Sequence, residues 1–242
     1  MRLSGRLDNE LVARGLLPTR SKAQEAIRVG QVLCDGEVCT KPARKVDDTT
    51  AIELAGRVMP YVSRGGLKLE KALETWGISL VGRTVLDIGS STGGFTDCAL
   101  QHGATRVIAI DVGTDQMVEP LRSDPRVELH EQTDFRRMPA EELAGADISG
   151  IDVSFISVRL LVDAVAATDV REVICLVKPQ FECGQREAKA HKGVVVDEAV
   201  RQRAVADVRD AFERAGFSCT GVVPSPITGG DGNVEYLAHF VR

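Results

Sequence analysis

Small residues that could hold a ligand follow directly on an apolar run in the first half of the chain. Val85 to Ile88 reads as a buried parallel strand, and helical sequence begins at Phe95. A strand that turns through glycines into a helix leaves backbone N–H groups facing a ligand. Glycine is needed there because a side chain would block the ligand's approach to the backbone. The cofactor-binding residues predicted in this segment are Asp87, Gly89, Ser90, Ser91, Gly93, Gly94 and Phe95.

Carboxylates at successive predicted strand ends narrow the choice of cofactor. Asp111 ends the strand after the glycine loop, and Asp134 follows the next one. An acid at the second strand end commonly accepts hydrogen bonds from the ribose hydroxyls of a nucleoside, although any one aspartate could instead be a turn residue or a helix cap. The glycine spacing is not the G-x-G-x-x-G of NAD enzymes. An acid, one residue and then a small-residue loop is how the S-adenosylmethionine site of many methyltransferases begins, so we expect S-adenosylmethionine and methyl transfer. Methyltransferases of this type place an acid near the adenine amino group at the position of Asp134, in Gln132-Thr-Asp-Phe.

The next two predicted strand ends bear on which atom is methylated. Cytosine C5 methylation needs a cysteine nucleophile at or beyond the fourth strand, and Asp152 to Phe155 contains none. Enzymes that methylate exocyclic amines carry two prolines between an acid and an aromatic residue there, and this segment lacks both prolines. Lys178 ends the following strand, and ammonium groups are rarely buried without a partner or a role. Base methylation is therefore disfavoured.

Alternating strand and helix patterns from residue 64 onward predict the sheet that positions these residues. We expect helices at 67–76, 95–101 and 197–215, and strands at 84–88, 106–110, 126–130, 147–153, 173–177, 219–227 and 234–241. Such alternation predicts a mostly parallel sheet with helices on both faces. The glycine-rich turn at 228–233 makes the last strand antiparallel. The fold class is therefore α/β, with a Rossmann-like methyltransferase domain.

The residues before this sheet predict a smaller α+β unit. Helical spacing at 6–14 and after Thr19 is followed by a hairpin around Asp35-Gly36 and a strand at 51–54. Gly56 and Pro60 predict a domain boundary. We expect a smaller domain at 1–57, a linker at 58–63 and the methyltransferase domain at 64–242.

Charge is distributed unevenly along the chain, whose net charge is −5. Residues 1–71 contain 13 Lys and Arg against 9 Asp and Glu, and the remainder contains 17 against 26. A mildly basic end on an acidic body fits RNA contact through that end. Six cysteines without a C-x-x-C pair and four dispersed histidines predict reduced core residues and no metal site. With no long apolar run and no signal-peptide pattern, we expect a cytoplasmic protein and no membrane partner.

The N-terminal segment resembles a known RNA-binding module. Arg6-Leu-Asp, residues 19–27, Gly30-Gln-Val and Asp35-Gly36 resemble the domain named after small-subunit ribosomal protein S-four. The resemblance implies that basic side chains of this module contact RNA phosphates, whereas on composition alone they could be ordinary solvated charges. The RNA-binding residues expected on this basis, together with one at the start of the second domain, are Arg6, Arg20, Lys22, Arg28, Lys41, Arg44 and Arg64.

Over nearly its whole length, including the S-four-like domain, the chain resembles the TlyA (hemolysin A) family, which is similar to FtsJ-type enzymes. The resemblance is carried by residues 63–69, the glycine loop, residues 152–157 and residues 177–182. It implies 2′-O-methylation of ribose, on cytidines of 16S and/or 23S RNA in ribosomal subunits. It also implies a catalytic tetrad, in which Lys178 favours the alkoxide, Asp152 orients Lys178, and two further residues complete the network. The tetrad is Lys68, Asp152, Lys178 and Glu235.

Some questions stay open at this point. Where mycobacterial relatives carry Arg-x-Trp-Val, this chain reads Met59-Pro-Tyr-Val62, so a signalling role of Tyr61 to Ser63 is open. The alternatives to an enzyme are a non-catalytic RNA-binding or ribosome-assembly factor and, with no membrane-active helix in view, a haemolysin. The methylated nucleotide, the subunit and the oligomeric state are undetermined by sequence.

Overall fold

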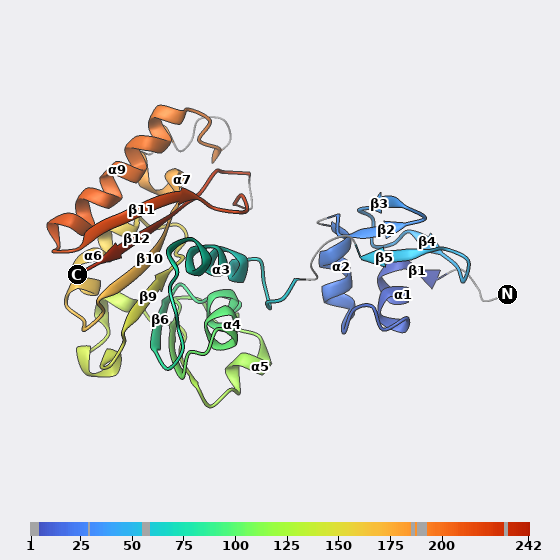
Figure 1. The fold of residues 1–242 in the computed structure, drawn as a ribbon, viewed down its shortest axis with the longest axis horizontal. Coiled ribbons are helices and arrows are strands. Elements are labelled where there is room, and N and C mark those ends of the chain that lie inside the picture. The colour runs from blue at the N-terminus through green and yellow to red at the C-terminus, as the bar shows by residue number, and fades with distance from the viewer. Residues whose placement is uncertain (1–4, 29, 55–58, 185–186, 188–192, 230–231) are drawn as a thin grey trace. The chain divides into compact units, whose positions relative to one another are not determined.

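The computed structural model divides the chain into two compact units, Met1–Pro60 and Tyr61–Arg242 (Figure 1). It describes residues 5–28, 30–54, 59–184, 187, 193–229 and 232–242. Gly56 and residue 58, on which part of the boundary and linker prediction falls, lie outside the described residues.

The N-terminal unit packs two helices against short strands. Its core joins residues of α1 (Leu7–Ala13) and α2 (Arg20–Arg28) to residues of the strands. The sheet has the order β3 (Glu37–Cys39), β2 (Val32–Cys34), β5 (Ile52–Leu54), and a separate pair joins β1 (Gly5–Arg6) to β4 (Lys45–Val46). Asp35 and Gly36 both have positive φ, as a tight hairpin turn requires. The expected hairpin is therefore present, and the pair β1–β4 is an addition.

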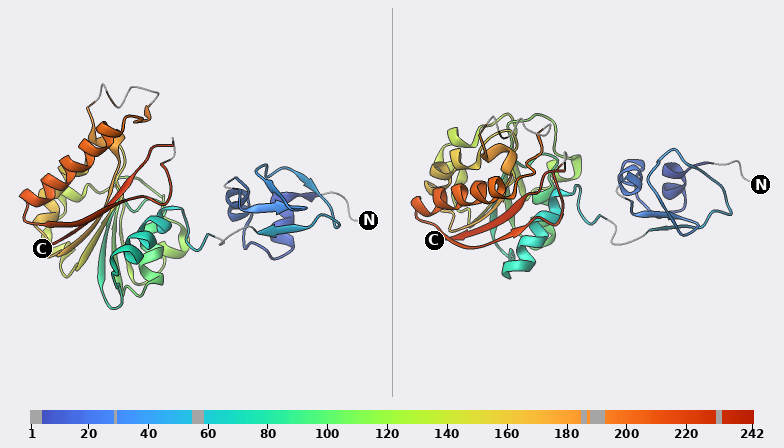
Figure 2. Two further views of the ribbon diagram at one scale, coloured as in Figure 1. Left: turned by 45° about the horizontal axis from the view of Figure 1, so that its top comes forward. Right: turned by 90° about the horizontal axis from the view of Figure 1, so that it is seen from above.

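A seven-stranded sheet organises the second unit, in the order β11-β12-β10-β9-β6-β7-β8 (Figures 1 and 2). Only β12 runs antiparallel to its neighbours β10 and β11, and the other adjacent pairs are parallel. The predicted α/β class with one antiparallel strand is confirmed. The strands are β6 (Thr84–Ile88), β7 (Arg106–Ile110), β8 (Val127–His130), β9 (Ile148–Ile151), β10 (Glu172–Val177), β11 (Ser218–Pro224) and β12 (Tyr236–Val241).

Helices cover both faces of this sheet because successive strand residues point to opposite sides. Val85 packs in the core beneath α3 (Gly65–Trp76) and α4 (Gly94–Gln101), whereas its neighbour Leu86 packs in the core beneath α9 (Glu198–Arg214). The other helices that the structure describes in full have three to five residues, too few for a hydrophobic period to reveal them. They are α5 (Glu119–Arg122), η1 (Phe135–Arg137), η2 (Ala140–Leu143), η3 (Val158–Leu160), α6 (Val162–Ala166) and α7 (Pro179–Glu182).

The residues just before α3 are anchored in the second unit. Tyr61 is only 2% exposed, and a Cβ at Gly66 would lie 2.3 Å from its ring. The backbone N–H of Val62 donates to Asp97 Oδ2 in α4 at 2.7 Å. The sequence placed these two residues in a linker, but their contacts make them part of the unit that carries the sheet.

Candidate active site

Four charged side chains from distant parts of the sequence meet beside the sheet. Asp152 directly follows β9, Lys178 directly follows β10, and Glu235 directly precedes the antiparallel β12. The strand ends that carry these three residues lie at the same edge of the sheet, because β9, β10 and β12 are neighbours. Lys68 reaches this edge from α3. Lys68 Nζ lies 2.8 Å from Glu235 Oε2 and 3.4 Å from Asp152 Oδ2, and Lys178 Nζ lies 2.6 Å from Asp152 Oδ1. The structure thus brings together all four residues of the expected tetrad.

Burial makes the pairing of these charges necessary. Lys68, Lys178 and Glu235 are each less than a tenth exposed, and Asp152 is half-buried. Ions removed from water are tolerated only when opposite charges and hydrogen bonds replace the solvent. Two ammonium groups facing two carboxylates meet that condition. The cluster can therefore hold a charged lysine at the edge of the sheet, where substrates of α/β enzymes bind.

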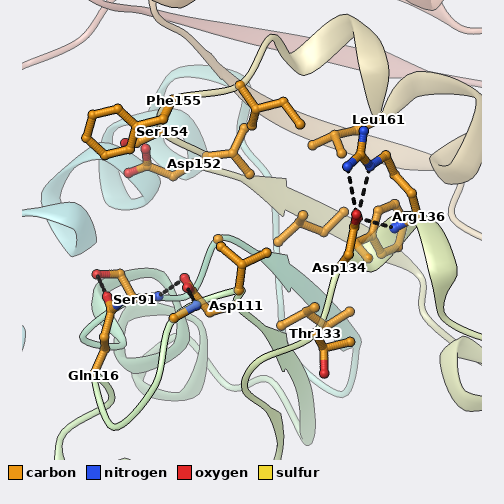
Figure 3. A pocket seen from close by; sticks show the side chains of 18 residues that line it. Ser91, Asp111, Gln116, Thr133, Asp134, Arg136, Asp152, Ser154, Phe155 and Leu161 are labelled. Carbon is orange, nitrogen blue, oxygen red and sulfur yellow. Dashed lines mark hydrogen bonds and ion pairs between the residues drawn. The ribbon is translucent and has the colours of Figure 1, made fainter.

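A pocket with a cavity volume of about 380 Å³ opens beside Asp152, at the carboxyl ends of β6, β7 and β9 (Figure 3). Five of the predicted residues line it, namely Gly89, Ser91, Asp111, Asp134 and Asp152. The other polar lining residues and the apolar walls were not predicted as site residues. They include Gln116, Thr133, Arg136, Ser154, Ile110, Val153, Phe155 and Leu161.

Asp111 organises the wall formed by the glycine loop. Its carboxylate accepts hydrogen bonds from the backbone N–H groups of Ser91, at 2.8 Å, and Gly113, at 2.7 Å. Ser91 has a φ of 46° and donates its hydroxyl to Gln116 Oε1 at 3.0 Å. A carboxylate oxygen has two lone-pair sites, so Asp111 keeps acceptor capacity for a ligand hydroxyl. This wall suits the ribose of a nucleoside.

Asp87 lies behind the loop instead of lining the pocket. It is fully buried, and its Oδ2 accepts a hydrogen bond from Thr96 Oγ1 at 2.6 Å. Burial raises the pKa of this carboxyl to about 7. Its other oxygen and the hydroxyl of Ser90 have no hydrogen-bond partner among the described residues. Neither residue lines the pocket, so the charge of Asp87 can act on a ligand there only at a distance.

The end of the glycine loop serves packing. A Cβ at Gly93 would lie 2.4 Å from Leu121, and one at Gly94 would lie 2.4 Å from Ser63 Oγ. Phe95 is buried against Gly150 of β9. None of these three predicted cofactor residues lines the pocket. The absence of a side chain at Gly94 lets α4 approach α3, and the ring of Phe95 packs α4 on the sheet at Gly150. These contacts support the loop from behind.

Asp134 lines the pocket with its carboxylate already engaged. Oδ1 accepts hydrogen bonds from the backbone N–H and Nε of Arg136 at 3.1 and 2.9 Å, and Oδ2 accepts one from Nη2 at 2.6 Å (Figure 3). Hydrogen bonding to Arg136 lowers the pKa of Asp134. The residue thus caps η1 and pairs with a cation, which the sequence pattern Gln-Thr-Asp-Phe did not distinguish from contact with an adenine amino group.

Two residues of the loop after β9 belong to the site although the sequence pattern did not single them out. Ser154 Oγ accepts a hydrogen bond from Lys178 Nζ at 2.8 Å. Phe155 is 91% exposed and has a φ of 66°, a conformation that is unusual for an aromatic residue. Both lie in the Asp-Val-Ser-Phe segment, in which the sequence pattern pointed only to Asp152 and to the absence of prolines.

In the N-terminal unit, a buried carboxylate gathers two of the predicted RNA-binding arginines. Asp8 is fully buried and accepts hydrogen bonds from Arg6 Nε and Nη2, both at 2.9 Å, from Arg20 Nε at 3.0 Å and from Gln24 Nε2 at 2.7 Å. The Arg6 guanidinium holds the pKa of Asp8 far below its usual range. Arg20 remains half-exposed, so the pair is fixed in place with charge still facing solvent.

The other predicted RNA-binding residues do not join this cluster in the structure. Arg44 donates to Cys39 Sγ at 2.9 Å, and Arg28 donates to Gln24 Oε1 at 3.4 Å. Lys22 is half-buried and Lys41 is exposed. Arg64 is exposed in the other unit, just before α3.

Comparison with known proteins assigns both units. The family model of FtsJ-like methyltransferases matches residues 61–242, and that of the S4 domain matches residues 5–52. The 16S/23S rRNA (cytidine-2′-O)-methyltransferase TlyA of Mycobacterium tuberculosis is 42% identical over 96% of this chain and 88% of its own length. Hemolysin A of Brachyspira hyodysenteriae is 39% identical over 98% and 99%, respectively. A solved structure from Streptococcus thermophilus has a TM-score of 0.77 and 42% identity, covering 99% of this chain and 88% of that one.

Proposed function

The chain belongs to the FtsJ-like methyltransferase family and, within it, to the TlyA (hemolysin A) group, and we propose that it methylates ribose 2′-hydroxyls of ribosomal RNA with S-adenosylmethionine as donor. The observation that carries the proposal is the chain of ion pairs beside the pocket that runs from Lys178 through Asp152 and Lys68 to Glu235.

The network supplies the chemistry that a ribose hydroxyl needs. A hydroxyl is a weak nucleophile, and a nearby ammonium favours its alkoxide form. Lys178 is the lysine placed for this role, because Lys68 is held by Glu235 at 2.8 Å. Asp152, 2.6 Å from Lys178 Nζ, pairs with that ammonium and holds it in place. Alignment of the hydroxyl with the methyl group contributes more to the rate than activation of the hydroxyl does, since a fixed near-attack geometry removes several kcal/mol from a barrier.

The pocket beside the network fits the methyl donor. When bound, S-adenosylmethionine supplies a methyl group activated on a sulfonium cation. Asp111 would hold the ribose hydroxyls of the cofactor, and the loop at Gly89 would approach its amino-acid end. The carboxyl of Asp87 supports this orientation, because its charge behind the loop would attract a cationic group in the pocket from a distance. Asp134, already paired with Arg136, would help to shape the part of the pocket that receives the adenine.

The N-terminal unit supports RNA as the methyl acceptor. It matches the S4 domain and presents Arg6 and Arg20 on one buried carboxylate. Guanidinium groups suit phosphate because their planar donors match its oxygens. The relative from Mycobacterium tuberculosis is named for cytidines of 16S and 23S rRNA. We take cytidine in one or both ribosomal subunits as the target.

The test is methyl transfer from labelled S-adenosylmethionine to small and large ribosomal subunits purified from cells that lack the gene. Mass spectrometry of the digested RNA should detect 2′-O-methylcytidine. Binding of subunits without incorporation of methyl groups would indicate an RNA-binding factor instead. The name of the Brachyspira relative makes haemolysis a third outcome, which release of dye from liposomes by the pure protein would reveal. No helix among the described residues is long and apolar enough to cross a membrane.

A further inference from the structure

We propose that Ser154 is a positioning residue for Lys178, whose ammonium it aims at the reacting hydroxyl. The inference rests on the proposed ribose methylation and concerns the same site. Ser154 follows Asp152 by two residues, and both line the pocket (Figure 3).

Lys178 contacts both Asp152 and Ser154, and the two contacts differ in kind. Nζ lies 2.6 Å from Asp152 Oδ1, a charge-assisted contact that holds the ammonium beside the carboxylate. The same ammonium donates a hydrogen bond to Ser154 Oγ at 2.8 Å. Asp152 balances the charge, and Ser154 fixes a second N–H donor and with it the rotation of the ammonium group.

Asp152 is also shared, which leaves Lys178 in need of a second partner. Its Oδ2 accepts a hydrogen bond from Lys68 at 3.4 Å, so one carboxylate faces two ammonium groups. Lysine has three N–H donors on a flexible stem, and an ion pair alone allows it to rotate. With one donor fixed by Ser154 and a carboxylate alongside, a third donor is available for the substrate hydroxyl.

The loop that bears Ser154 is held by the segment that follows Lys178. Glu182, which is buried in α7, accepts hydrogen bonds from the Val158 N–H at 2.8 Å and from the hydroxyl of Ser157 at 2.6 Å. The short stretch from Lys178 to Glu182 thus contacts the loop at two points, once at Ser154 and once just before η3. These contacts keep Ser154 and Lys178 at a fixed distance from each other.

Three variants of the full-length protein test the inference by steady-state methylation of ribosomal subunits. In Ser154→Ala, kcat should fall about 10- to 100-fold, the loss expected for a hydrogen bond to a charged group, while the KM for subunits and the affinity for S-adenosylmethionine change less than about twofold. Ser154→Thr keeps the hydroxyl and should restore most of kcat. Ser149→Ala is the matched control, because it removes a β9 hydroxyl that has no hydrogen-bond partner among the described residues.

Ser154 is exposed, so its removal should leave the melting temperature unchanged. A kcat for Ser154→Ala within about twofold of an active wild type would overturn the inference and leave the proposed function standing. A loss confined to S-adenosylmethionine affinity, or one that threonine does not restore, would also overturn it. An inactive wild type would instead contradict the proposed function.

Discussion

Gly229 lies so close to Glu235 that a Cβ at the glycine would approach Glu235 Oε1 to 2.7 Å. The turn before β12 therefore limits where the carboxylate that pairs with Lys68 can lie. Because a glutamate side chain can rotate away from such an overlap, an added methyl group should displace the carboxylate more than it destabilises the fold.

Gly229→Ala should lower kcat for methyl transfer about tenfold, since it weakens the Lys68–Glu235 ion pair by one charge-assisted hydrogen bond. The melting temperature should change little. Gly184→Ala is a suitable control, because its Cβ would meet nothing nearer than Glu187 Oε2 at 3.9 Å. Full activity in Gly229→Ala would show that the position of Glu235 is not critical.

Affinity for S-adenosylmethionine should depend on pH through Asp87. Burial raises the pKa of this carboxyl to about 7 from the ordinary 3.8, so the apo protein at neutral pH holds it partly protonated. A cationic ligand nearby favours the ionised form. Calorimetric titration should therefore show affinity that rises as the pH rises toward about 7 and levels off above that.

Asp87→Asn should remove this pH dependence while keeping the acceptor for Thr96. The sign for stability is opposite to that for binding. A carboxyl whose pKa is raised by folding stabilises the fold below its unfolded pKa of 3.8, and this contribution is lost as the pH rises through about 7. The variant should therefore lose less stability than the wild type between about pH 5 and 8. Equal pH dependence of affinity in both proteins would contradict the role given to Asp87.

RNA affinity should depend on Asp8, although its side chain is buried away from any ligand. Asp8→Asn would release Arg6 and Arg20 from their shared partner, and filter binding of ribosomal RNA should weaken about tenfold with cofactor affinity unchanged. Asp48→Asn changes the net charge equally at an exposed site of the same unit. RNA affinities that match between the two variants would mean that charge alone is responsible.

Asp8 also predicts how the N-terminal unit responds to acid. Hydrogen bonds from Arg6 hold the pKa of Asp8 below its unfolded value of 3.8. Its contribution to stability is therefore present above about pH 4 and is lost as the pH falls further, through the folded pKa. Acid unfolding followed by circular dichroism should show a smaller decline of stability below about pH 4 in Asp8→Asn than in the wild type.

Much of the fold could be predicted because its strands are apolar runs bounded by turn residues. Val85 to Ile88 and the strand ending before Asp111 were placed correctly for this reason. The helices of three to five residues were missed, since they are shorter than the period that would reveal them. The β1–β4 pair was missed as well, because two residues give no alternation.

The candidate site was predictable in composition and not in detail. Lys68 and Glu235 are far apart in the chain, and only the resemblance to a family joined them before the structure did. Asp134 shows the limit most clearly, because an aspartate before a short helix reads the same as a cap and as a ligand. Its pairing with Arg136 depends on side-chain geometry that no spacing encodes. Ser154 needed the distance to Lys178 before it could be distinguished from a loop residue.

The most direct test of the account is methylation of ribosomal subunits by Lys178→Ala. We expect 2′-O-methylcytidine to fall below about 1% of the wild-type rate, because the group that favours the alkoxide is gone, while the dissociation constant for S-adenosylmethionine stays within about twofold. Mass spectrometry of the RNA and calorimetry with the cofactor give the two values. Methylation retained at the wild-type rate by Lys178→Ala would contradict the assignment of the tetrad.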